Sequence, residues 1–180
     1  MKCSRRPAAF SLLEMLTTVA ALVIVLGLMV SLAGYVRSRS AEALTRKLLS
    51  RLERAMEDPK YAADPALQAA LARVPKLVSA KDIIPSEEAL ATAALANSKG
   101  FVRAWHQHVA ADVLSDLPAS LYDQTMLRDA WGTPVVFMPA GAINIAISPQ
   151  NRYFFFSAGA DRQFKTVDDN LYSYERTWER

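Results

Sequence analysis

Twenty-two consecutive residues near the N-terminus, from Met15 to Val36, carry no charged side chain. As an α-helix, a run of this length extends over about 33 Å, close to the thickness of the hydrocarbon core of a bilayer. The run therefore predicts a helix that can cross a membrane once. Glu14 lies directly before the run, where an ionisable group is costly and usually has a function.

Two ordinary kinds of segment share this composition. A secretory signal peptide has an apolar core of only about 7 to 15 residues, followed by a small-residue cleavage site. Here the run is longer, and its one reasonable cleavage site, Ser31-Leu32-Ala33, is followed by more apolar sequence. An uncleaved signal anchor fits the length, and under that interpretation Glu14 is an incidental charge at the membrane surface.

A third interpretation uses the residues before the run as well. A short basic leader containing Arg5 and Arg6 ends at the small residue Ala9 and is followed by Phe10-Ser11-Leu12-Leu13-Glu14. This pattern resembles the N-terminus of type IV pilins and type II secretion pseudopilins. In that family a prepilin peptidase cuts before the Phe and N-methylates the new amine, so the resemblance implies processing between Ala9 and Phe10. The pattern departs from the family at Ala9, where the family normally has glycine.

The resemblance also implies a role for Glu14 and a set of partners. Its carboxylate is an acceptor for the cationic N-terminal amine of a neighbouring subunit, so a charge that is costly alone sets the register of a filament. The implied protein is a structural subunit of a type II secretion pseudopilus, which supports protein export. It crosses the inner membrane once, with its C-terminal domain in the periplasm or at the cell exterior. Implied partners are other pseudopilin subunits, prepilin peptidase, the inner-membrane secretion platform and membrane lipid.

Two alternatives to the pseudopilus stay open. A type IV pilus subunit has the same N-terminal pattern, but this chain has no C-terminal cysteine pair and no proline near Ser31 in the middle of the predicted helix. The other alternative is an uncleaved, membrane-anchored exported domain that binds a ligand and forms no filament.

Charge and cysteine content limit the class of protein further. The chain has 21 basic and 18 acidic residues, but Lys2, Arg5 and Arg6 precede Phe10, which leaves 18 of each sign from Phe10 onward. A neutral chain gives no electrostatic support for nucleic-acid binding. The single cysteine, Cys3, also precedes Phe10, so the processed chain contains no disulfide.

Five segments and an α+β fold are expected. The segments are a leader at 1–9, a transmembrane and assembly helix at 10–36, its amphipathic continuation at 37–58, a helical insertion at 59–118, and an antiparallel sheet with an Asp-rich loop at 119–180. Leu44, Leu48 and Leu52 recur every four residues in the amphipathic segment and predict an apolar stripe that packs on the sheet. Pro59 ends this long helix.

Capping and β-branched residues predict the later elements. We expect helices at 65–73, at 87–96 after the N-cap Ser86, and at 101–114, and strands at 135–138, 143–147 and 153–156. The sequence Asp129-x-Trp131-Gly132-x-Pro134 is similar to an element that opens the sheet in major pseudopilins. That resemblance implies a tight turn and an aromatic anchor.

The segment from Ser157 to Asn170 resembles the loop that binds calcium in the major pseudopilin. Ca²⁺ takes oxygen ligands, and a loop that gathers carboxylates, an amide and backbone carbonyls supplies them. The candidate ligands that the resemblance implies are Asp161, Asp168 and Asp169, followed by Ser157 and Asn170.

A second interpretation of this loop is that its carboxylates solvate a surface turn and bond the local backbone. Arg162 and Lys165 depart from the family, which usually has glycine at the first position and often at the second. Two cations inside the loop weaken a calcium site and can replace the ion through salt bridges. The sequence therefore leaves both interpretations open.

No residue pattern predicts an enzyme. His106 and His108 are two apart in a predicted helix and point in different directions, so they do not form a metal-ligand pair. The chain has no Gly-x-Ser-x-Gly sequence, and no serine is placed by sequence against either histidine. We therefore expect a structural protein with no catalytic residues.

Overall fold

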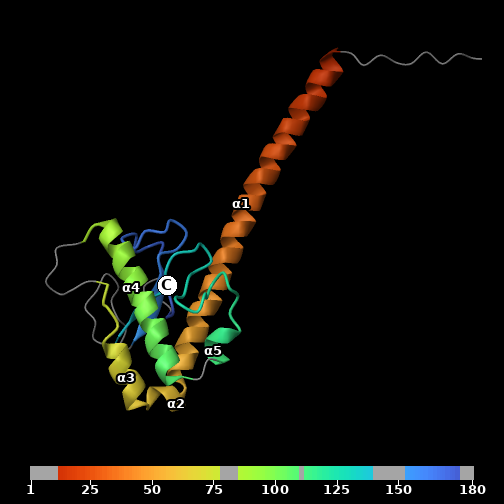
Figure 1. Cartoon of the computed structure of the whole chain (residues 1–180). Coiled ribbons are helices and arrows are strands. Elements are labelled where there is room, and N and C mark those ends of the chain that lie inside the picture. Colours follow the sequence, from red (N-terminus) through yellow and green to blue (C-terminus); the bar gives the residue numbers. More distant parts are fainter. Residues whose placement is uncertain (1–11, 78–84, 110–111, 140–152, 175–180) are drawn as a thin grey trace, which may run out of the picture. The chain divides into compact units, whose positions relative to one another are not determined.

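A computed structural model describes residues 12–77, 85–109, 112–139 and 153–174 (Figure 1). Ala9, Phe10 and the strand expected at 143–147 lie outside the described residues. The chain divides into two units, Met1–Arg39 and Ser40–Arg180. Helix α1 (Leu12–Glu57) runs through both and ends directly before Asp58 and Pro59, as predicted. Asp58 then caps α2 (Pro59–Ala62) by accepting a hydrogen bond from the backbone N of Lys60 at 2.9 Å.

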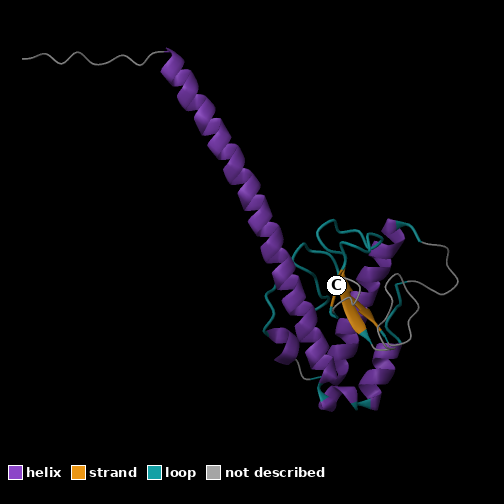
Figure 2. Cartoon of the chain, turned by 180° about the vertical axis from the view of Figure 1, so that it is seen from behind, coloured by secondary structure: helices purple, strands orange, loops and turns teal. Residues whose placement is uncertain are grey.

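Three further helices follow, all purple in Figure 2. Helix α3 (Pro65–Ala72) has Asp64 as its N-cap, and α4 (Glu87–His108) has Ser86, whose Oγ accepts from the backbone N of Ala89. The sequence predicted the Ser86 cap correctly. Helix α5 (Asp112–Ser115) is a single short turn.

The predicted break between residues 96 and 101 was wrong, because α4 is continuous there and ends at His108 rather than at residue 114. Asn97 is fully buried within α4 and donates to the carbonyl oxygens of Pro75 and Phe137, at 2.7 and 2.8 Å. Gly100 lies against the ring of Pro75, where an added Cβ would be 2.8 Å from Cδ. Tertiary contacts therefore stabilise α4 at Gly100, although glycine has a low helix propensity.

Within the described residues, the sheet has three antiparallel strands in the order β1-β2-β3, and with the helices they give the α+β fold that the sequence predicted. They are β1 (Val136–Met138), β2 (Phe154–Ser157) and β3 (Leu171–Tyr172), and Phe137 pairs with Phe155. All the residues of these strands are buried, so both faces of the sheet are covered. The sequence did not predict β3.

Side chains alternate between the two faces of the sheet and build two cores. Phe137 and Phe155 join a cluster with four side chains of the C-terminal half of α1, Leu48, Leu49, Leu52 and Met56. The neighbouring strand residues, including Val136 and Phe156, join a second cluster with Leu90 and Ala94 of α4. The predicted packing of the amphipathic half of α1 on the sheet is confirmed.

Candidate functional site

The N-terminal part of α1 exposes its large apolar side chains from Leu12 to Val36. The most apolar window of this helix has a mean hydropathy of 2.5, and by length and composition α1 can cross a membrane. Thr17 and Thr18 donate their hydroxyl hydrogens to the carbonyl oxygens of Glu14 and Met15, at 3.0 and 2.9 Å. These polar groups are thus satisfied within the helix, as an apolar environment requires.

Glu14 lies in the first turn of α1 with an exposed side chain. A negative charge in a first turn interacts favourably with the positive end of the helix dipole. The bond between Ala9 and Phe10, the predicted processing site, precedes the described residues.

The turn that opens the sheet is held by a carboxylate, that of Asp129, which is 1% exposed. Its Oδ1 accepts from the backbone N of Trp131 and of Thr133, each at 2.9 Å, and its Oδ2 accepts from the hydroxyls of Thr133 and Ser157. Gly132 completes the turn with a φ of +89°. The side chain of Trp131 is half-buried and packs on the core cluster that contains Phe137. Sequence analysis anticipated a turn and an aromatic anchor here, but not a carboxylate that joins the turn to β2.

The structure joins two of the candidate calcium ligands, Asp161 and Asp169, by a hydrogen bond and exposes a third, Asp168. Oδ2 of Asp169 accepts from the backbone N of Asp161 at 2.9 Å, and Oδ1 of Asp161 accepts from the backbone N of Gln163 at 2.8 Å. The close approach depends on Gly159, which has a φ of +75° and packs directly against the backbone carbonyl of Asp169. The side chain of Asp168 is exposed.

The other two candidate ligands are buried. The Ser157 hydroxyl donates to Asp129 and accepts from the backbone N of Gly159 at 3.1 Å. The Asn170 amide donates to the carbonyl of Phe164 at 3.1 Å, while its Oδ1 has no hydrogen-bond partner in the part of the chain that the structure describes. Within residues 12–77, 85–109, 112–139 and 153–174, no group of three or more His, Cys, Asp and Glu side chains is arranged to hold a metal ion. Calcium binding therefore stays a prediction.

Glu87 fixes this loop, a role that the sequence pattern did not predict. Its two carboxylate oxygens accept from the backbone N of Phe164 and of Lys165, at 2.7 and 3.3 Å. Because Glu87 is the first residue of α4, the loop is held at the beginning of that helix. Within the loop, Arg162 has a φ of +61°. This left-handed conformation favours glycine, which is the residue the resembling family usually has there.

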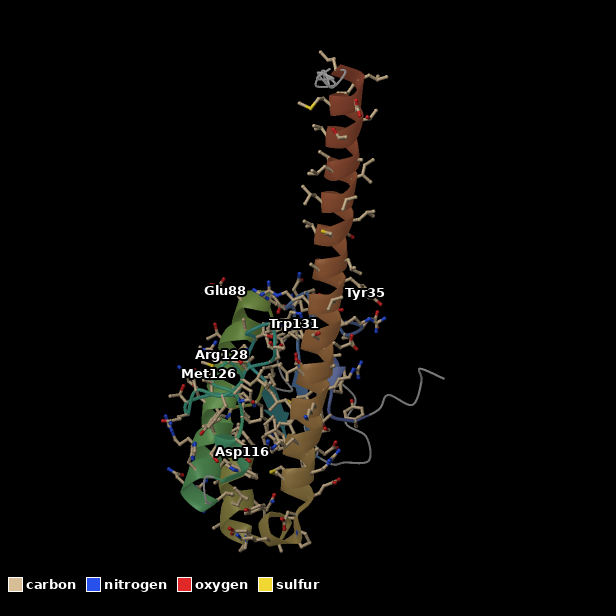
Figure 3. All side chains as sticks on the ribbon, turned by 90° about the vertical axis from the view of Figure 1, so that its right-hand side faces the viewer. Tyr35, Glu88, Asp116, Met126, Arg128 and Trp131 are labelled. Carbon is tan, nitrogen blue, oxygen red and sulfur yellow. The ribbon has the colours of Figure 1, made fainter. Side chains whose placement is uncertain are left out.

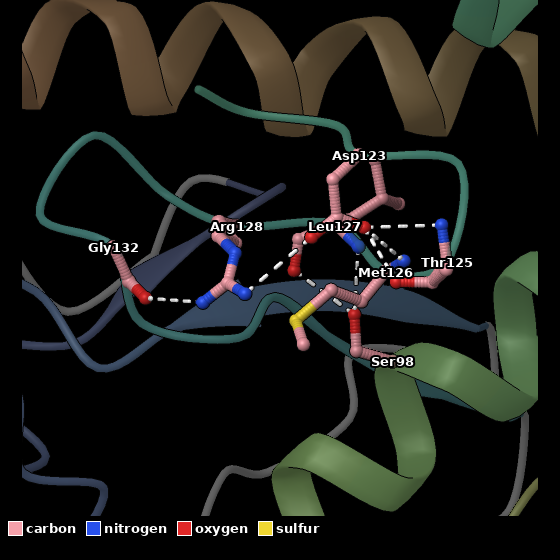
Figure 4. A network of polar contacts seen from close by, with 7 residues as sticks. All are labelled: Ser98, Asp123, Thr125, Met126, Leu127, Arg128 and Gly132. Atoms are coloured by element: carbon pink, nitrogen blue, oxygen red, sulfur yellow. Dashed lines mark hydrogen bonds and ion pairs between the residues drawn. The ribbon is translucent and has the colours of Figure 1, made fainter. Parts of the chain in front are cut away.

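A second polar network lies beside the turn that contains Asp123 (Figure 4). Oδ1 of Asp123 accepts from the hydroxyl and backbone N of Thr125, at 2.6 and 3.0 Å, and Arg128 lies 3.4 Å from Oδ2. The Thr125 hydrogen bonds, with help from Met126 and Arg128, lower the pKa of Asp123 to about 2. Burial, reinforced by the charge of Asp123, raises the pKa of the neighbouring Tyr122 above its ordinary value.

The two histidines do not share a site in this arrangement. The ring of His106 hydrogen-bonds the hydroxyl of Tyr122, and His108 is exposed at the last position of α4. The Tyr122 contact gives His106 a structural role at the edge of the Asp123 turn.

A scan of protein-family models gives no match to the chain, and searches of curated proteins and of solved structures give none either. What defines the class is the architecture itself. A long N-terminal apolar helix packs on a small antiparallel sheet, which is a pilin-like arrangement.

Proposed function

We propose that the chain is a structural subunit of a type II secretion pseudopilus, processed between Ala9 and Phe10 and polymerised through its N-terminal helix. It crosses the inner membrane once, and its C-terminal domain lies in the periplasm. It acts without catalysis, binds no nucleic acid, and works with other pseudopilin subunits, prepilin peptidase, the inner-membrane secretion platform and membrane lipid.

One observation carries this proposal, namely the division of α1 into two kinds of surface. Leu48, Leu49, Leu52 and Met56 are each at most 2% exposed and belong to the domain core, whereas Leu12 to Val36 present exposed apolar side chains. An exposed apolar surface of this length needs lipid or other apolar helices around it. A helix that is a membrane anchor at one time and a filament core at another meets that need in both states.

The test is to identify the N-terminal residue of the protein isolated from membranes with and without an active prepilin peptidase. We expect N-methylated Phe10 in the first preparation and the intact leader in the second, read by mass spectrometry. Ala9→Gly restores the usual family residue and is expected to be cut at least as fast as the natural chain. Ala9→Leu places a bulky side chain at the same position and is expected to block cleavage.

The alternatives give different results. A chain that still begins at Met1 or Lys2 beside an active peptidase is an uncleaved, membrane-anchored binding domain, and the filament proposal is then wrong. A processed chain that assembles without a secretion platform, into filaments that extend from the cell, is a type IV pilus subunit.

Calcium belongs to the same proposal as a structural ion of the loop from Ser157 to Asn170. It is favoured by Asn170 Oδ1, a buried acceptor with no partner in the described part of the chain, next to Asp169. Residues Asp161, Asp168 and Asp169 would hold the ion, which would offset the repulsion between their charges. Isothermal titration of the chain with Ca²⁺ tests this, and an absence of both heat and thermal stabilisation at millimolar calcium rejects it.

A further inference from the structure

A groove between α3 and α4 is lined by small side chains and by cations. Its volume is about 660 Å³, and the small side chains in its lining include Ala69 and Ala96. Arg73 of the loop after α3 and Lys99 and Arg103 of α4 line it with exposed side chains. Small side chains in the lining let the backbone of another polypeptide approach closely.

None of the described residues that line this groove carries a carboxylate. A second hollow of about 530 Å³ is also lined by Lys99 and Arg103, and none of its described lining residues carries a carboxylate. None of the salt bridges within the described residues involves Arg73, Lys99 or Arg103. Three cations therefore lie close together on one surface without an acidic partner from the described part of the same chain.

The other end of α4 has the opposite charge. Glu87 and Glu88 form its first turn, and Figure 3 labels Glu88 there. The loop that Glu87 holds adds Asp161, Asp168 and Asp169, and the five carboxylates outnumber the two cations of the loop, Arg162 and Lys165, by three. Glu88 and Asp168 are exposed. We call this group the acidic end of α4.

The two charged regions of one molecule are too far apart to neutralise each other. Glu88 and Arg103 are 15 residues apart on α4, which is about 22 Å along the helix axis. The Debye length at physiological ionic strength is about 8 Å. The chain from Phe10 onward has no net charge, so two copies do not repel each other as a whole.

We propose that the groove between α3 and α4 binds the acidic end of α4 of a second copy of this chain. In the calcium-free loop, three cations without an acidic partner in the described part of the chain meet a surplus of three carboxylates, a surplus that a bound Ca²⁺ would reduce to one. Complementary surfaces at opposite ends of one helix make a heterologous, head-to-tail contact, which repeats from copy to copy and gives an open filament unless the rotation between copies closes a ring. The inference rests on the proposed filament for its setting and gives that filament a second contact, made by the folded domain.

The contact can be tested on residues 40–180, which fold on their own because every buried member of both cores lies between Leu48 and Tyr172. We expect this domain to self-associate at low ionic strength up to millimolar concentration, measured by sedimentation with EDTA present, and to dissociate as salt is raised. Lys99→Glu with Arg103→Glu reverses the groove, and Glu88→Lys with Asp168→Lys reverses the acidic end. Each pair is expected to weaken association at least about tenfold.

The decisive measurement mixes the two reversed domains. Each one alone has like charges at both ends, but in the mixture the acidic groove of one meets the basic end of the other, so association is expected to return. Lys47→Glu with Arg54→Glu makes the same change in net charge as Lys99→Glu with Arg103→Glu, but on an exposed part of α1, and this variant is expected to associate as the natural domain does. Thermal melts check that every variant is folded.

Several results overturn the inference. The natural domain staying monomeric, the reversed variants associating normally, or the mixture failing to regain association would each do so. A monomeric domain that binds polyglutamate would also do so, because the partner of the groove would then be an acidic chain from another protein. Each leaves the proposed function intact, because processing and the N-terminal helix are absent from this experiment. Conversely, the domain can self-associate while the full chain in membranes keeps its leader. That combination would reject the pseudopilus proposal and support the contact between domains.

Discussion

Ser157 donates a hydrogen bond to the carboxylate of Asp129 across 2.6 Å, although the two residues are 28 positions apart in the chain. The bond joins the turn before β1 to the end of β2, and both side chains are buried. A buried carboxylate is tolerated only where donors surround it, and Asp129 has four, two backbone N–H groups and two hydroxyls. The turn is thus linked to β2 by a buried group of polar side chains within an otherwise apolar core.

Ser157→Ala is expected to destabilise the domain by about 1.5 to 3 kcal/mol, because it removes a hydrogen bond to a charged group and leaves the backbone N of Gly159 without its acceptor. Denaturant unfolding measures the change. In an Asp129→Asn background the same substitution is expected to cost less, since the charged acceptor is already gone. Equal costs in both backgrounds would mean that the two side chains do not interact.

Arg162→Gly is expected to stabilise the domain by up to about 1 kcal/mol, because Arg162 holds a left-handed φ of +61° that costs a residue with a Cβ and suits glycine. The unfolding midpoint in urea reports the gain. Arg162→Ala is the matched control, since it removes the charge but keeps the Cβ. A gain of the same size in Arg162→Ala would assign the effect to charge instead of backbone conformation.

The pKa of Asp123 predicts a contribution of this residue to acid stability. The folded pKa is about 2, below the ordinary value of 3.8, so the ionised form is favoured by folding. Its contribution is fully present above pH 3.8 and is lost as the pH falls through about 2. We expect the difference in unfolding free energy between the natural chain and Asp123→Asn to shrink over that window. Thr125→Ala removes the largest cause of the lowered pKa of Asp123 and is expected to narrow the pH range over which the stability difference changes. A stability difference between the natural chain and Asp123→Asn that is constant with pH would contradict the lowered pKa of Asp123.

The sequence predicted those elements that local chemistry determines. The uncharged run and the four-residue spacing of Leu44, Leu48 and Leu52 specify α1, and proline and capping residues specify its end and the beginnings of α3 and α4. The contacts of Glu87 and the bond between Asp129 and Ser157 were missed because the partners are distant in sequence. Glu87 bonds backbone groups 77 and 78 positions away, which no local pattern encodes. Strand β3 has only two residues, too few for a period-two pattern.

Gly100→Ala tests how tertiary contact overrides helix propensity in α4. Alanine inside a helix is ordinarily better than glycine by about 1 kcal/mol. Here the new Cβ would be 2.8 Å from Cδ of Pro75, whose ring cannot rotate away. We therefore expect no gain or a net loss in unfolding free energy. In a Pro75→Ala background the same change is expected to stabilise, and stabilisation in the natural background would show that the loop after α3 moves easily.

Glu14→Val is expected to leave processing at Phe10 unchanged and to abolish filament assembly. If the N-terminal amine of one subunit pairs with Glu14 of its neighbour, removing the carboxylate leaves a cation without its partner in an apolar setting, at a cost of about 3 to 5 kcal/mol per contact. The sheared filament fraction and the mass of the mature N-terminus are the two measurements. Thr18→Val is the matched control, because it replaces a polar group on the same helix whose hydrogen bond is satisfied internally. Filaments of normal yield from Glu14→Val would reject charge pairing as the basis of assembly, and filaments lost equally in Thr18→Val would assign the effect to any change of this helix surface.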